Sequence, residues 1–171
     1  MDADRVEFID EPAIRSIVNA VFESLNATLT ALLPDARIEH VGSTSIPGSV
    51  TKGDLDICVQ VEQSAFSEAD RILSERFARN VGSDQSASLS SFVDNALPVP
   101  VGVQLVALGG NEDFFLRWRD LLRSSPEILA QYDHLKRRWH GRSHAGYRKA
   151  KSTFIEQMLQ APLAAGGTTH E

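Results

Sequence analysis

Two aspartates separated by one residue, Asp54 and Asp56, are the side chains of this sequence whose spacing best suits metal binding. Alternate side chains of a β-strand point to the same face, so the two carboxylates would lie together while Leu55 points to the other face. Their Cα atoms would be about 6–7 Å apart, because a strand rises about 3.3 Å per residue. Carboxylate oxygens are the ligands that hard cations prefer. The pair therefore predicts a site for Mg²⁺ or Mn²⁺.

A loop rich in glycine and small hydroxyl residues precedes these aspartates. Its Pro47-Gly48 dipeptide favours a type II turn. Hydroxyls and backbone amides of such a loop can donate hydrogen bonds to phosphate oxygens. The residues expected to do so are Gly42, Ser43, Thr44 and Ser45. Lys52 lies where it could reach a phosphate, although a lysine in a loop is more often simply solvated.

Two other kinds of site do not fit the same stretch. A Walker A loop requires Lys and then Ser or Thr directly after its second glycine, whereas Ser49 follows Gly48 here. A Ser–His–Asp hydrolase built from Ser43, His40 and Asp54 would need the strained strand-to-helix turn that presents a nucleophilic serine. The sequence has no such pattern. Metal and phosphate chemistry is what remains.

Length and charge narrow the class of protein. The 171 residues carry a net charge of −6, which argues against a general affinity for nucleic acid or for an anionic membrane. No apolar run approaches the roughly 20 residues of a membrane helix, and the first residues lack the features of a signal peptide. The single cysteine, Cys58, excludes an intrachain disulfide. We expect a cytoplasmic protein. The basic segment 136–151 leaves a nucleic-acid partner open, although such a run is usually a solvated helix face.

Apolar periodicity predicts the elements that must position the aspartates. Helices are expected over residues 12–32, 64–77, about 114–124, 126–139 and 143–159. Asp10 is expected to cap the first of these helices and Ser64 the second. Strands are expected over 37–41, 54–61, 91–94 and 101–108. This order predicts an α+β fold: a small mixed β-sheet flanked by helices, with a C-terminal helical cap. We expect residues 1–110 to form the core, 111–160 the cap of the same compact domain, and 161–171 a flexible tail.

The Gly42-Ser43 turn, the loop and the strand that begins Asp54-Leu55-Asp56 resemble the signature of the nucleotidyltransferase superfamily, the polymerase-beta-like fold. The whole chain is more closely similar to one branch of it, the GrpB family. Residues 40–48 (HVGSTSIPG), with Lys52 and Asp56, match that family's loop motif. Residues 117–136 and 147–155 are similar to its later helices. The resemblance spans residues 38–159.

This resemblance implies that the Gly-Ser turn holds a nucleoside triphosphate and that the two aspartates bind Mg²⁺. It also implies that Tyr147 and Lys151, which share one helix face, line the cleft. Active nucleotidyltransferases usually add a third carboxylate from a neighbouring strand. The residue expected at that position here is Gln104, which can bind a metal weakly through its carbonyl oxygen but cannot accept a proton. Glu39 or Asp94 would substitute only if the fold brings one of them in.

Three functions remain open at this level. The first is Mg²⁺-dependent transfer of a nucleotidyl group from a nucleoside triphosphate to a small acceptor, with Asp54 and Asp56 as catalytic residues. The second is a non-catalytic module that binds a nucleotide or another phosphorylated small molecule, because the third carboxylate is missing. The third is an interaction domain whose cleft is vestigial.

Overall fold

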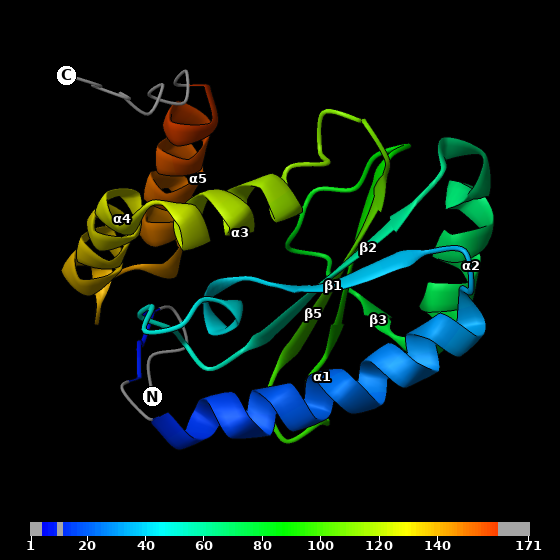
Figure 1. Cartoon of the computed structure of the whole chain (residues 1–171), viewed down its shortest axis with the longest axis horizontal. Coiled ribbons are helices and arrows are strands. Elements are labelled where there is room, and N and C mark those ends of the chain that lie inside the picture. The colour runs from blue at the N-terminus through cyan, green and yellow to red at the C-terminus, as the bar shows by residue number, and fades with distance from the viewer. Residues whose placement is uncertain (1–4, 10–11, 161–171) are drawn as a thin grey trace, which may run out of the picture.

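The computed structural model describes residues 5–9 and 12–160 and has a five-stranded mixed sheet at its centre (Figure 1). The strands are β1 (Arg37–Val41), β2 (Leu55–Val61), β3 (Ala78–Arg79), β4 (Leu89–Asp94) and β5 (Val101–Ala107). Their order in the sheet is β1-β2-β5-β4-β3. Only β2 and β5 are parallel neighbours; the other three pairings are antiparallel. The two strands that carry most apolar residues therefore lie side by side.

Among the described residues, five α-helices surround this sheet. They are α1 (Pro12–Leu32), α2 (Phe66–Arg76), α3 (Phe115–Ser124), α4 (Pro126–Trp139) and α5 (His144–Gln160), with short 3-10 turns η1 (Ser43–Ser45) and η2 (Gln63–Ala65). Helices α1 and α2 pack against the sheet, while α3, α4 and α5 form a cap at the end away from α2 (Figure 1). Within the described ranges, none of these helices has the length and apolar character needed to cross a membrane.

Strand alternation gives the sheet two different faces. Leu55 and Ile57 of β2 and Val103 of β5 join the main core with α1 and α2. Asp56 of β2 and Gln104 of β5 therefore project from the opposite face. That second face is apolar only in part, since a smaller cluster of Val41, Cys58, Val106 and Leu116 covers it beside α3. The polar remainder of this face is the floor of the candidate site.

The cap has its own apolar core, and the glycine-rich loop is built into it. Trp118 of α3, Tyr132 of α4 and Ile155 of α5 are buried together with Ile46 from the loop. The ring of Phe154 stacks on Tyr132 at 5.7 Å between centroids. Burying Ile46 in this way fixes the loop against the cap, so cap and site are one packing unit.

The structure confirms the α+β fold, the mixed sheet and the helical cap, and it corrects details. Strand β2 begins at Leu55, so Asp54 lies one residue before the strand. Ser64 does not cap α2: it lies inside η2, and α2 begins after Ala65. The two-residue strand β3 was not expected, because it is too short for a periodic pattern. The expected cap Asp10 and tail 161–171 lie outside the described residues.

Candidate functional site

Asp56 is held between two glycines on neighbouring chain segments. In the sheet register it lies opposite Val41 of β1 and Gly102 of β5. Gly42 adopts φ 72° and ψ −177°, and a Cβ placed there would overlap Oδ2 of Asp56 and lie 2.9 Å from its Cγ. A Cβ at Gly102 would lie 3.1 Å from Oδ1. The missing side chains create the space in which this carboxylate sits.

The electrostatic environment of Asp56 favours its protonated form. Burial, followed by the charge of Asp54, raises the Asp56 pKa to about 6, while the positive charges of Lys151 and Lys52 oppose that rise. Lys52 is paired with the other aspartate, since its Nζ lies 2.9 Å from Asp54 Oδ2. Two carboxylates kept together at this cost are typical of a functional site, and a divalent cation would offset it.

Asp56→Asn is expected to stabilise the metal-free protein at pH 8 by about 2–3 kcal/mol. The folded-state pKa of about 6 lies above the usual aspartate value of 3.8, so the folded protein binds more protons than the unfolded chain between these values. Stability of the wild type therefore falls as pH rises from about 4 to 6, and the variant lacks this fall. Urea unfolding in EDTA at pH 4 and pH 8 measures the difference. Parallel pH profiles for the two proteins would contradict the argument.

Gln104 occupies the position next to the aspartate pair on β5. Its side-chain carbonyl oxygen accepts a hydrogen bond from the hydroxyl of Ser91, its partner residue on β4. Its amide nitrogen faces the space over Gly102, 3.6 Å from the position of a Cβ there. The oxygen expected to bind a metal is thus engaged by Ser91, and a donor group points toward Asp56.

Neither substitute for a third carboxylate reaches the pair. Asp94 lies on the α2 face of the sheet and forms an ion pair with Arg76 at 3.7 Å. Glu39 lies on the site face but is bound by Arg119 of α3, at 2.7 Å, and by Arg37. Within residues 5–9 and 12–160, no three His, Cys, Asp or Glu side chains are grouped as metal ligands. Two carboxylates still suit Mg²⁺, which is often held by one or two carboxylates and substrate phosphates.

The hydroxyls of the loop have different environments. Thr44 and Ser45 are buried; Thr44 Oγ1 donates to the Asp54 carbonyl at 2.9 Å, and Ser45 Oγ donates to the Gly42 carbonyl at 2.7 Å. Both hydroxyls stabilise the turn. The sequence predicted that they would donate to a phosphate, but in the structure they donate to the backbone instead. The ring of His40 hydrogen-bonds to Thr44 as well, at 2.9 Å. Of these loop hydroxyls, only that of Ser43, which is partly exposed, has no hydrogen-bond partner among the described residues.

Three cationic side chains from three helices hold the loop carbonyls. Arg15 of α1 donates to the carbonyls of Thr44, at 2.8 Å, and Ser49, at 2.5 Å. Arg123 of α3 donates to the carbonyl of Ser45 at 2.8 Å. Sequence reasoning missed both arginines, because each occupies an ordinary polar position on an amphipathic helix. Their effect is to fix the loop backbone through its carbonyl groups.

The third cation, Lys136 of α4, is fully buried. Its Nζ donates to Val50 O at 2.7 Å, Ser49 Oγ at 2.8 Å and Asp133 Oδ1 at 3.0 Å. Burial lowers the pKa of Lys136 to about 8, although Asp133 opposes this shift. The sequence placed Lys136 in a basic surface run; the structure instead makes it an internal anchor for the end of the loop.

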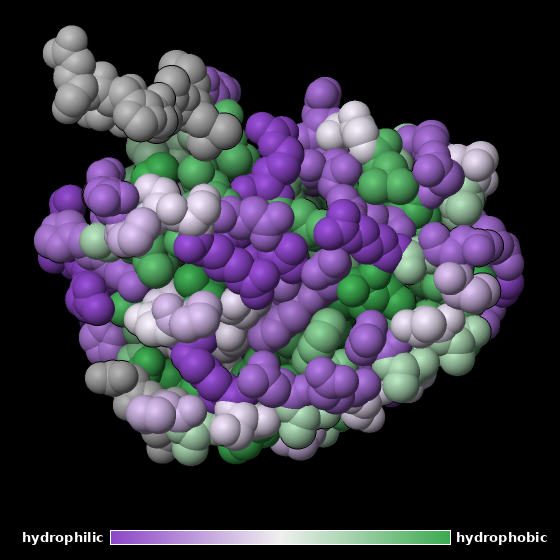
Figure 2. Space-filling model, in the orientation of Figure 1, coloured by the Kyte–Doolittle hydropathy of each residue, from purple (hydrophilic) through white to green (hydrophobic). Residues whose placement is uncertain are grey.

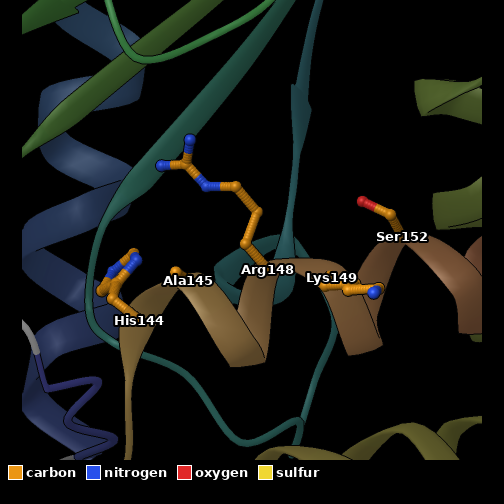
Figure 3. Close-up of a pocket in the computed structure, with 5 residues that line it drawn as sticks. All are labelled: His144, Ala145, Arg148, Lys149 and Ser152. Atoms are coloured by element: carbon orange, nitrogen blue, oxygen red, sulfur yellow. The ribbon is translucent and has the colours of Figure 1, made fainter.

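Helix α5 forms the wall opposite the aspartates. Lys151 acts electrostatically on Asp56, whereas Tyr147 is buried, with its hydroxyl bonded to that of Tyr132. Burial raises the pKa of Tyr147, so its hydroxyl stays neutral. A pocket opens along the neighbouring face of α5, where Arg148 and Ser152 project from the same side of the helix (Figure 3). The surface over α3 and the adjoining β1 is also largely hydrophilic (Figure 2).

The fold that surrounds this site is that of the nucleotidyltransferases. The Cid1 poly(U) polymerase bound to MgATP aligns with a TM-score of 0.52 and 16% identity, over 75% of this chain and 42% of that one. The Cid1 complex with MgGTP aligns with a TM-score of 0.53 and 15% identity. The structure of GrpB from Enterococcus faecalis aligns with a TM-score of 0.60 and 19% identity, over 88% of this chain and 97% of that one.

Sequence comparison gives the family. A UPF0157 protein of Vibrio cholerae is 35% identical over 156 residues, which are 91% of this chain and 83% of that protein. The model of the GrpB protein family matches residues 14–161. The chain therefore belongs to the GrpB family, and its fold is similar to that of solved nucleotidyltransferase structures.

Proposed function

We propose that this protein binds a nucleoside triphosphate together with Mg²⁺ or Mn²⁺ and transfers the nucleotidyl group to a small acceptor. The observation that carries the proposal is the Asp56 carboxylate, half-buried beside Asp54 in a space that Gly42 and Gly102 leave open. Such a pair is destabilising in the apo-protein and becomes favourable when a divalent cation and its phosphates are bound.

Each residue has a role in this proposal. Asp54 and Asp56 hold the metal, which neutralises the phosphates when bound. The amides of the Gly42-Ser43 turn and the Ser43 hydroxyl bind the triphosphate, and Lys52 and Lys151 offset its charge. The acceptor oxygen forms a bond to the α-phosphorus while the α–β phosphoanhydride bond breaks, and pyrophosphate leaves with the electron pair. The hydroxyl proton passes to solvent, since Gln104 cannot accept it.

A second candidate is a module that binds the same ligand without turnover. The observation that favours it is Gln104, whose carbonyl oxygen is engaged by Ser91 at the position where an enzyme of this fold would place its third carboxylate. In this case the site senses or stores a nucleotide or another phosphorylated small molecule. The cytoplasmic location and the division into core and cap stay predictions under both candidates.

Asp54→Asn with Asp56→Asn is expected to abolish Mg²⁺-dependent binding of nucleoside triphosphates. Each of the four common triphosphates is added with Mg²⁺ or Mn²⁺, and the melting temperature and isothermal titration report binding. The double variant should show at least a tenfold loss of affinity, because it removes both metal ligands. Asp94→Asn is the matched control, since it removes an aspartate from the opposite face of the same sheet.

Pyrophosphate release, measured with the wild type and a panel of small hydroxyl acceptors, separates the two candidates. Release that the double variant loses identifies an enzyme, whereas metal-dependent binding without release across the panel favours the module. Absence of any shift with every metal and nucleotide, or equal binding by wild type and double variant, would overturn both candidates.

A further inference from the structure

The pocket on α5 has a chemical character of its own. It is lined by His144, Ala145, Arg148, Lys149 and Ser152 (Figure 3). His144, Arg148 and Ser152 recur every four residues and so form one stripe of the helix, next to the stripe that carries Tyr147 and Lys151. The pocket therefore borders the wall that faces Asp56 without including the lysine that acts on it.

Arg148 and Lys149 make this pocket cationic, and neither has an acidic partner among the described residues. No Asp or Glu occurs between Asp133 and Glu156 in the sequence. Within the part of the chain that the structure describes, neither Arg148 nor Lys149 forms an ion pair; the recorded bond of Arg148 is a donation to the Gly82 carbonyl at 2.5 Å. Two cations without carboxylates and the hydroxyl of Ser152 suit an anion with several acceptor oxygens.

The contact of Arg148 places the pocket on one side of the site. Gly82 belongs to the segment between β3 and β4, in which the side-chain carbonyl oxygen of Gln85 accepts from the backbone amide of Ser91. The hydroxyl of Ser91 in turn bonds to Gln104. Arg148 thus reaches the β4 side of the sheet face, whereas the Gly42-Ser43 turn and Lys52 lie on the β1–β2 side. In an in-line displacement, the attacking and leaving oxygens lie on opposite sides of the phosphorus.

Building on the proposed function, we propose that the α5 pocket binds the acceptor substrate through a phosphate group that the acceptor itself carries. The acceptor is then a small hydroxyl compound with a phosphomonoester, held by Arg148, Lys149 and Ser152 while its hydroxyl faces the triphosphate. A phosphomonoester is close to a dianion at pH 7 and so matches the two unpaired cations. A small acceptor fits better than nucleic acid, because the protein has a net charge of −6.

Titration of the metal-free protein with glycerol 3-phosphate and inorganic phosphate, followed by amide NMR shifts, tests the pocket directly. We expect saturable shifts around residues 144–152, none with glycerol, and at least tenfold weaker binding in Arg148→Gln/Lys149→Gln. Lys149→Gln alone should weaken binding severalfold and guards against a folding effect of losing the Gly82 contact. Arg137→Gln/Arg138→Gln removes the same charge from exposed positions of α4 and should leave binding unchanged.

A second titration, in saturating Mg²⁺ and a non-hydrolysable nucleoside triphosphate, separates this proposal from the proposed function. Binding of glycerol 3-phosphate that persists beside the nucleotide supports an acceptor site. Competition between the two would overturn the proposal, because the pocket would then hold the triphosphate. Equal weakening by the α4 control variant, or single-stranded RNA that binds the pocket more tightly than glycerol 3-phosphate, would also overturn it. If the wild type binds phosphate in the pocket but binds no metal–nucleotide complex, the proposed function is refuted and the phosphate pocket is not.

Discussion

Gly42→Ala is expected to lower the free energy of unfolding by at least 3 kcal/mol, the sum of two effects. The backbone at φ 72° and ψ −177° lies in a region that is essentially restricted to glycine, which costs a side chain about 1–3 kcal/mol. The new Cβ would also overlap the Asp56 carboxylate, and moving that carboxylate costs more because it sits between two strands. Urea unfolding gives the stability, and titration with Mg²⁺-nucleotide reports on the site.

Two variants separate the contributions at Gly42. Gly48→Ala imposes a side chain at φ 74° with no atom within 4 Å of the new Cβ, so it measures the cost of a positive φ without any overlap. Asp56→Gly removes the atoms that the new Cβ would meet, and Gly42→Ala/Asp56→Gly should therefore be less destabilised than the sum of the single variants by about 1–2 kcal/mol. An additive double variant would show that the overlap is relieved by other movements.

Local pattern was sufficient for most of the fold. The spacing of apolar residues in α1 and the continuous apolar strands β2 and β5 were predicted within one or two residues, because these features depend on neighbours in sequence. The short β3 was missed, since two residues carry no periodicity. The ends of elements at Asp54 and Ser64 were misplaced for a related reason: a boundary is decided by hydrogen bonding that the pattern does not show.

The candidate site was predictable only in its local part. The Gly-Ser turn and the aspartates lie within fifteen residues of one another, and their spacing could be read directly. Gly102 could not be found in this way, because its meaning depends on a strand register that sets it opposite Asp56. Arg15 and Arg123 look like solvated residues of amphipathic helices, and only the tertiary fold directs them to the loop carbonyls. For Gly102, the signal available in the sequence was a lone glycine inside a predicted strand, β5.

Lys136 shows best how the fold changes the meaning of a residue. The sequence places it in a basic run, yet its ammonium is enclosed with Asp133 and Ser49 behind the loop. Lys136→Met is expected to destabilise the protein at pH 7 by about 3 kcal/mol, because it leaves the buried Asp133 carboxylate without its cation. Asp133→Asn/Lys136→Met should recover part of this loss, since an asparagine carbonyl can still accept from Ser49 and Val50.

The lowered pKa of Lys136 leads to a separate prediction about the pH dependence of stability. The folded-state pKa of Lys136, about 8, is below the usual lysine value of 10.5, so the unfolded chain binds more protons between these values. Wild-type stability should gain up to about 3 kcal/mol from this lysine as pH rises from 8 to 10.5, and Lys136→Met should lack that gain. Lys149→Met, at an exposed position of α5, should keep the wild-type profile. A Lys136→Met protein as stable as the wild type at pH 7 would mean that the loop is anchored by Arg15 and Arg123 alone.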